Sequence, residues 1–178
     1  MFPEAYLDDV VFKIASPPSA QFTRETWWDA LLRLYAEDTS PEQAGAVFTD
    51  SQRQAITTRI VTDVRAMLLE AVFWTSFLHV PRFFETLFDP RRRQNIQPAL
   101  VLSMISVGVL MQSSALGRGE AGQKRALKLL DLAHSALQAS LLSNWVDTGL
   151  VQAAWVRMRW TSRNTDVLTT TYQVYGLL

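Results

Sequence analysis

The sequence contains no cysteine among its 178 residues. That absence excludes disulfide bonds, a thiolate nucleophile and cysteine-ligated zinc within this chain, and it is typical of an intracellular protein. Histidine occurs only twice, at His79 and His134, and neither an HExxH nor an HxH pattern is present. We therefore expect no metal site, and we interpret His134 as a polar surface residue or a hydrogen-bonded core histidine.

A long uninterrupted apolar run is also missing. The longest run, Ala99 to Met111, contains Ser103 and Ser106 and is shorter than the roughly 20 residues that span a bilayer. It is typical of a buried helix. The N-terminus has no basic segment followed by an apolar run, so we expect neither a secretory signal nor a membrane partner.

The net charge is zero, but the charges are unevenly distributed. Residues 1–90 hold 7 basic and 13 acidic side chains and residues 91–178 hold 10 and 4, so the halves carry −6 and +6. The basic side chains of the second half are dispersed, apart from Arg91–Arg93. We expect the two halves to dock on each other, and we expect no direct binding of DNA by this chain.

The apolar residues of the chain recur with helical spacing. Hydrophobic residues make up 48% of the chain and charged residues 19%, which is a globular composition. The spacing of the apolar residues predicts an all-α fold, a bundle of about five to six helices in one domain, residues 23–160. An irregular segment, residues 1–22, is expected before this domain and a polar tail, residues 161–178, after it.

The first two long helices are expected in the acidic half. Thr26 and Asp29 have the spacing of a capping box, so the first helix is expected to begin at Thr26. A short helix or loop follows at Thr39–Pro41, and a long helix then covers residues 50–78. Its apolar stripe is Ile56, Ile60, Val64, Leu68 and Val72. The charged residues that fall away from that stripe are Arg53, Asp63 and Glu70.

Two prolines bound a short aromatic stretch, residues 81–90. Pro81 suits the first turn of a helix, and Asp89, which precedes the second proline, ends it. We predict a short helix whose apolar face packs between the long helices. The residues expected to be buried on that face are Phe83, Phe84, Leu87 and Phe88. Arg91–Arg93 are expected in solvent, and His79 is expected to cap the C-terminus of the preceding long helix.

Three further helices are expected in the basic half. The first covers residues 97–114, with Pro98 in its first turn, and is apolar on most sides, so it should lie at the centre. The second covers residues 122–142. Its apolar face is Ala126, Leu129, Leu130, Ala133, Leu137 and Leu141, and its polar side holds Lys124, Lys128, Asp131 and Gln138. The third begins near Asp147. Its apolar side is Leu150, Val151, Ala154, Trp155 and Met158.

One motif resembles a nucleotide-binding loop. Residues 117–122 read GRGEAG, a literal GxGxxG that opens a helix. A dinucleotide site requires a strand directly before the first glycine, whereas the residues before Gly117 have a helical pattern, and Gln123 stands where a P-loop has its lysine. We interpret the motif as a helix–helix loop. We predict no catalytic, cofactor-binding or metal-binding residue and no enzymatic activity; a dinucleotide-binding enzyme is the alternative.

The order of these segments resembles a known family. TWWDALLRLY (26–35) is followed by FWTSFLHVPRFFETLFDP (73–90), NIQPALVLSMISVGVLMQSSALGRGEAG (95–122) and QKRALKLLDLAHSALQASLLSNWVDTGLVQAA (123–154). The set is similar to the regulatory domain of fungal-specific transcription factors, the middle homology region of binuclear zinc-cluster regulators. The resemblance covers about residues 26–155, and its specificity lies in the order of the segments.

The resemblance implies a regulatory domain that acts in transcription in a fungal nucleus, through protein partners or an effector. It implies DNA contact only through a separate zinc-cluster module, whose cysteines are absent here. Family domains stay apolar beyond the fifth helix, where this chain has Arg157 and Arg159, so the resemblance predicts a partial domain. A helical scaffold or dimerisation module without a transcriptional role is the alternative. An uncovered apolar side of the last helix would favour self-association in either case.

Overall fold

The computed structural model describes residues 20–37, 47–70, 75–115 and 119–163. Within these ranges the chain forms seven helices and no strand, so the predicted all-α fold is confirmed. The helices are α1 (Ala20–Glu37), α2 (Asp50–Glu70), α3 (Val80–Phe88), α4 (Pro90–Arg93), α5 (Pro98–Ala115), α6 (Gly119–Leu142) and α7 (Thr148–Arg163). Residues 1–19, Thr39–Pro41 and the tail beyond residue 163, for which predictions were made, lie outside the described residues.

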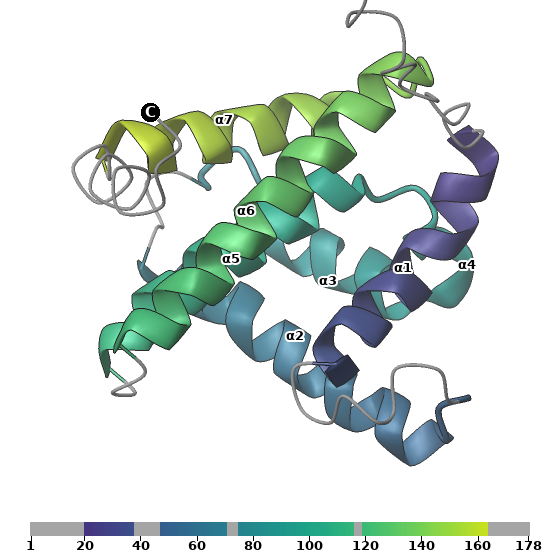
Figure 1. Cartoon of the computed structure of the whole chain (residues 1–178). Coiled ribbons are helices and arrows are strands. Elements are labelled where there is room, and N and C mark those ends of the chain that lie inside the picture. Colours follow the sequence, from purple (N-terminus) through teal and green to yellow (C-terminus); the bar gives the residue numbers. More distant parts are fainter. Residues whose placement is uncertain (1–19, 38–46, 71–74, 116–118, 164–178) are drawn as a thin grey trace, which may run out of the picture.

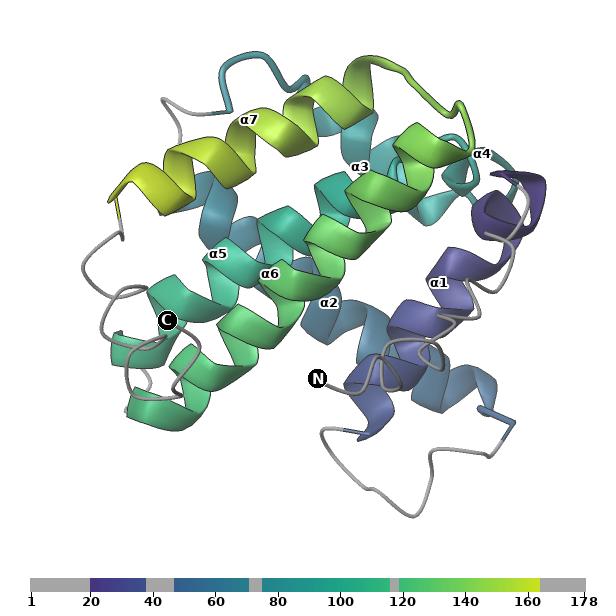
Figure 2. The same ribbon diagram turned by 45° about the horizontal axis from the view of Figure 1, so that its top comes forward.

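α5 is the central helix of the fold. α2, α6 and α7 pack along it, and α6 crosses in front of it in Figure 1. The same arrangement is visible after the rotation in Figure 2. With neighbours on three sides, α5 needs no polar face, and this explains why its sequence is apolar almost throughout. The predicted central position and the predicted start at Pro98 are both confirmed.

The proline-bounded helix also forms as predicted. α3 has Pro81 in its first turn, and Asp89 ends α3 and caps the four-residue α4. Burial on α3 is less complete than predicted: Phe83 and Leu87 are buried, Phe84 is half-buried and Phe88 is 48% exposed. Phe88 lies beside the buried face of α3. Its ring stacks on the ring of Phe84, with 5.9 Å between the two centroids.

The predicted role of His79 is wrong. The described part of α2 ends at Glu70, and residues 75–78 form a turn, so no long helix ends at His79. The His79 ring instead caps the start of α3, where Nδ1 accepts a hydrogen bond from the Arg82 backbone N–H at 3.1 Å. A helix start offers unpaired N–H groups, and an imidazole nitrogen that carries a lone pair can accept from one of them.

The prediction that Arg93 lies in solvent is also wrong. Arg91 and Arg92 are exposed as predicted, but Arg93 is half-buried. Its Nε donates to the Leu87 carbonyl at 2.6 Å, and its guanidinium lies 4.2 Å from the centroid of the Trp28 ring. Burial lowers the pKa of Arg93 from its ordinary value. Arg93 therefore joins α4 to α1.

Two helix starts differ from the predictions. α1 begins at Ala20, so Thr26 lies inside the helix and is not its cap. α6 begins at Gly119, which has φ +44°, a backbone angle that glycine adopts without a side-chain clash. On α6 the predicted apolar face is buried except at its end, where Leu137 is half-buried and Leu141 is 51% exposed.

Candidate functional site

A buried polar cluster joins α1, α2 and α5. The Asp63 carboxylate accepts hydrogen bonds from the Tyr35 hydroxyl at 2.7 Å and from Gln112 Nε2 at 3.0 Å. Asp63 is buried, although the apolar stripe of α2 predicted it on the polar side. Burial, and next the negative charge of Asp63, raise the pKa of the Tyr35 hydroxyl far above its usual range. The phenol therefore remains a protonated donor to Asp63.

Two arginine side chains lie close to the ring of the same tyrosine. The guanidinium of Arg125, on α6, lies 4.8 Å from the Tyr35 ring centroid, and that of Arg59, on α2, lies 5.7 Å from it. The cluster thus draws on α1, α2, α5 and α6. Its hydroxyl and its amide both donate to the carboxylate, which is typical of a structural network rather than of a group held ready for a substrate.

The α2–α5 crossing beside this cluster is unusually close. A Cβ atom added to Gly108 would lie 1.9 Å from the carbonyl oxygen of Asp63. Only glycine lets the two backbones approach to this degree, so Gly108 is required by packing and needs no ligand to explain it.

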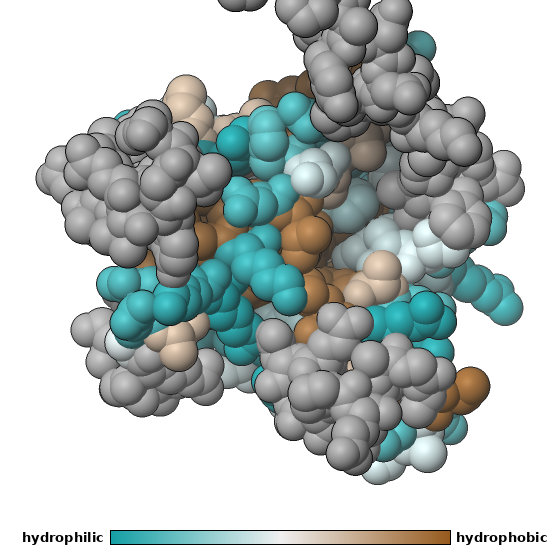
Figure 3. Space-filling model, in the orientation of Figure 1, coloured by the Kyte–Doolittle hydropathy of each residue, from teal (hydrophilic) through white to brown (hydrophobic). Residues whose placement is uncertain are grey.

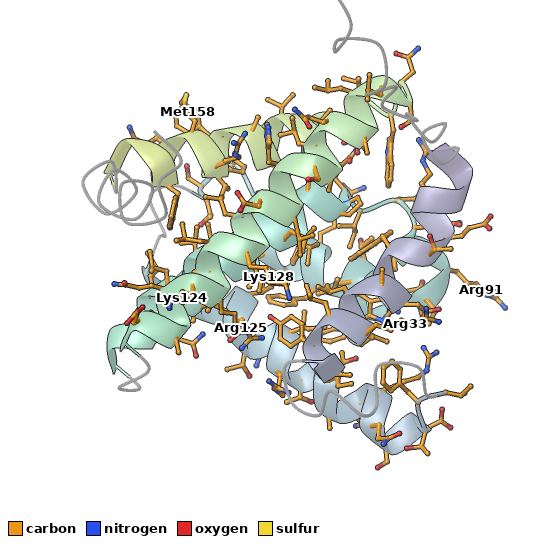
Figure 4. All side chains as sticks on the ribbon, viewed as in Figure 1. Arg33, Arg91, Lys124, Arg125, Lys128 and Met158 are labelled. Atoms are coloured by element: carbon orange, nitrogen blue, oxygen red, sulfur yellow. The ribbon has the colours of Figure 1, made fainter. Side chains whose placement is uncertain are left out.

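The surface between α1 and α6 combines apolar and basic groups. Figure 3 shows apolar atoms at the base of a hollow between these two helices. On the α6 side, Lys128 is exposed and Leu132 is 37% exposed. Figure 4 shows Lys128 extending from α6 toward α1. On the α1 side, Arg24 is exposed and lies 4.5 Å from the centroid of the Trp145 ring.

α7 has one buried face and one exposed apolar face. The buried residues, which pack toward α5 and α6, are Leu150, Ala153, Val156 and Trp160. On the other side Val151 is 66% exposed, Trp155 42% and Met158 50%, and Figure 4 shows Met158 pointing away from the body of the molecule. These three residues follow i, i+4, i+7 spacing and form one line. We call Val151, Trp155 and Met158 the α7 strip.

The predicted apolar side of this helix is wrong at one residue. The sequence placed Leu150 on the same apolar side as Val151 and Trp155, whereas Leu150 is buried. Asp147, where this helix was expected to begin, accepts a hydrogen bond from the Leu150 N–H at 3.0 Å and fixes the start of α7. Arg159 lies over the Trp155 ring at 5.5 Å and is the charged neighbour of the strip.

The nucleotide-loop motif lacks its required context. α5 continues to Ala115, so a helix stands where a dinucleotide site needs a strand. Gly117 itself lies outside the described residues. The two histidines are on different elements, and His134 is half-buried with no hydrogen-bond partner at Nδ1 among the described residues. Those residues contain no group of three or more His, Cys, Asp or Glu side chains that could hold a metal ion.

Within the described part of the chain, no helix has both the length and the apolar character needed to cross a bilayer. Comparisons with models of protein families, with characterised proteins and with solved structures find no match for this chain. The function therefore has to be inferred from the sequence pattern and from the two surfaces described above.

Proposed function

We propose that this chain is the regulatory helical domain of a fungal transcription factor, acting in the nucleus through protein contacts and without catalysis. The order of segments across residues 26–154 supports the transcriptional part, because it resembles the middle homology region of zinc-cluster regulators. The observation that carries the protein-contact part is the α7 strip.

The α7 strip favours contact with protein for an energetic reason. Fully burying an apolar side chain of this size is worth about 1.5–3 kcal/mol, and a partner would cover the roughly half of each strip side chain that is still exposed. An apolar line on a helix is the usual face for helix packing. The internal polar groups of Tyr35, Asp63 and Gln112 are used to hold the fold. The strip is thus an exposed apolar line outside that polar network.

DNA contact belongs, in this proposal, to a separate module. The basic residues described here are dispersed over several helices, so this chain should bind DNA weakly and without sequence preference, if at all. Specific, salt-resistant binding of this chain alone in a mobility-shift assay would contradict that assignment.

The proposal can be tested by tethering. The chain is fused to an unrelated DNA-binding module and expressed in fungal cells that carry a reporter gene with the matching site. We expect the fusion to change reporter transcription relative to the module alone. The triple variant Val151→Ser, Trp155→Ser, Met158→Ser should lose that effect. Leu69→Ser, which changes an exposed leucine on α2, is the matched control and should keep it.

A scaffold or dimerisation module is the second candidate, because the α7 strip can also pack against a second copy of itself. Light scattering on the purified chain separates the two. Self-association that the triple variant abolishes, together with no effect of the tethered chain on the reporter, would favour the scaffold and end the transcriptional proposal.

A further inference from the structure

α7 lies at the edge of the fold. In Figure 1 and Figure 2 it runs along the outside of the molecule, and α5 and α6 pack against one side of it. The α7 strip faces outward, as Figure 4 shows directly for Met158. Val151 and Met158, the two ends of the strip, lie roughly 10 Å apart along the helix, with Trp155 between them.

The exposed apolar surface is wider than the α7 strip itself. Ala154, next to Trp155, is also exposed. Gln152 Nε2 donates to the Phe77 carbonyl at 3.4 Å, which places the turn before α3 beside α7. Phe77 is 40% exposed. Two segments that are distant in the sequence thus contribute exposed apolar residues to this edge of the molecule.

The two ends of the strip carry opposite charges. Asp147 lies four residues before Val151 and therefore on the same side of the helix. Its carboxylate accepts from the Leu150 N–H and from Trp145 Nε1, both at 3.0 Å. Arg159, at the other end, is exposed.

No further charge interrupts the surface between these two residues. The residues of α7 that are exposed between Asp147 and Arg159 are uncharged: Thr148, Val151, Ala154, Trp155 and Met158. Arg157 is half-buried and, by helical periodicity, lies on a different side from the strip. The described turn before α3, residues 75–78, has no charged residue.

A surface with an acid at one end and a base at the other is complementary to itself when it is reversed. A two-fold pair brings the same surface of both copies together. In an antiparallel pair centred on Trp155, Arg159 lies opposite Val151 of the other copy and about 6 Å along the helix from its Asp147, within reach of a long side chain. A parallel pair would instead place Arg159 beside Arg159 and Asp147 beside Asp147. Antiparallel helix dipoles also attract each other.

We infer that the α7 strip pairs antiparallel with the α7 strip of a second copy of this chain. The two Trp155 rings lie near the two-fold axis, where aromatic side chains can stack or meet edge to face. Val151 of each copy faces Met158 of the other. This inference rests on the proposed function, because it names the protein that the α7 strip contacts and the direction in which the two helices run.

Crosslinking of the full chain tests the arrangement. Because the chain has no cysteine, each engineered cysteine is the only thiol of its variant. Ala154→Cys, beside the axis, should give a covalent dimer with a short bis-maleimide. Val151→Cys and Met158→Cys should each crosslink poorly alone, since like positions lie roughly 10 Å apart along the helices, and an equilibrated mixture of the two should crosslink well. Leu69→Cys, at an exposed leucine on α2, is the control and should give only background.

Two charge substitutions test the contacts at the ends of the strip. Arg159→Glu brings a carboxylate toward Asp147 of the other copy and should raise the Kd of the dimer about tenfold, measured by light scattering over a concentration series. Asp147→Asn keeps a capping oxygen but removes the charge, and should raise the Kd about threefold. In the Asp147→Asn background, Arg159→Glu should lose less affinity than in the parent chain. Arg91→Glu, an equal charge reversal on α4, should leave the Kd unchanged, because Arg91 points outward and away from α7 in Figure 4.

The possible results separate this inference from the proposed function. Crosslinking of Val151→Cys and Met158→Cys each alone, with no gain in the mixture, would show a parallel pair and reject the antiparallel one. Crosslinking of Ala154→Cys no stronger than that of Leu69→Cys would reject the pair altogether. If the tethered chain still changed the reporter in that case, the proposed function would stand with a different protein on the strip. Crosslinking as expected without any reporter effect would keep the pair and end the transcriptional proposal. Circular dichroism of each variant confirms that it is folded.

Discussion

α5 and α7 are both rich in apolar residues, yet the fold covers them very differently. α5 is enclosed by α2, α6 and α7, so that even Ser106 and Gly108 are buried. α7 is covered on one side and leaves Val151, Trp155 and Met158 exposed. α5 is thus the more apolar helix, but it exposes less apolar surface than α7 does. Exposed apolar area, rather than total apolar content, identifies the helix that is suited to binding.

The first substitution tests the enclosed region, and we expect the largest effect on the free energy of unfolding there. Gly108→Ala would place Cβ at 1.9 Å from the Asp63 carbonyl oxygen, and backbone cannot move aside as a side chain can. Alanine favours a helix by about 1 kcal/mol over glycine, but overpacking exceeds that gain. We expect a net loss of about 2–3 kcal/mol in urea denaturation.

Gly119→Ala is the control for backbone effects alone. Gly119 has positive φ, but nothing lies within 4 Å of an added Cβ, so a loss of about 1 kcal/mol is expected there. If Gly108→Ala were as stable as the parent chain, α2 and α5 would have to separate easily, and the enclosed character of α5 would be in doubt.

The second prediction concerns the buried cluster beside Gly108. Tyr35→Phe removes one donor from the buried Asp63 carboxylate and should cost about 2 kcal/mol. Asp63→Asn in the same background gives a double-mutant cycle, in which the two losses should be less than additive. Fully additive losses would show that the two residues act independently.

The same tyrosine predicts a dependence on alkaline pH. Burial and Asp63 raise the pKa of Tyr35 in the folded chain, so the unfolded chain releases this proton first, near its ordinary pKa of about 10. Above that pH the folded state binds more protons, and stability falls as pH rises. The fall between about pH 9 and 11 should be smaller in Tyr35→Phe than in the parent chain. An identical slope would contradict the burial of a protonated phenol.

The predictions from sequence that succeeded rest on local signals. Pro81, Asp89 and Pro98 act within one helical turn, so α3 and the start of α5 could be predicted. Asp63 could not, because its partners Tyr35 and Gln112 lie 28 and 49 residues away in the sequence. Periodicity describes the faces of one helix and cannot show which distant side chains will meet a polar residue.

α7 shows a second reason for failure. Its sequence carries two apolar stripes, the buried one that contains Leu150 and Trp160 and the α7 strip. Both have helical spacing, so the sequence alone does not show which one faces α5. Trp160 at the far end of the buried stripe was the available signal, because a tryptophan aligned with Ala153 and Val156 has a large apolar area to bury.

The third prediction concerns the cap of α3, where a smaller effect is expected because the site is exposed. His79→Ala removes the acceptor for the Arg82 N–H and should cost about 1 kcal/mol of stability. His79→Asn offers a side-chain oxygen at the same position and should retain most of the parent stability. Equal losses in both variants would show that the imidazole acts by packing and not as a cap.

The smallest effect on stability is expected at the α7 strip, at the other end of the comparison. Exposed side chains contribute little to folding, so Val151→Ser, Trp155→Ser and Met158→Ser should each change the unfolding free energy by about 0.5 kcal/mol or less.

Self-association, in contrast, should be more sensitive to these substitutions than to the others. In light scattering coupled to size exclusion at micromolar concentration, we expect the parent chain to form dimers or larger species and the triple variant to be monomeric. Leu69→Ser, at an exposed leucine on α2, should associate like the parent chain. A parent chain that stays monomeric would show that the α7 strip does not pair with itself and would leave a different protein as its partner. A triple variant that unfolds would instead place these side chains within the core, and the contrast between α5 and α7 would no longer hold.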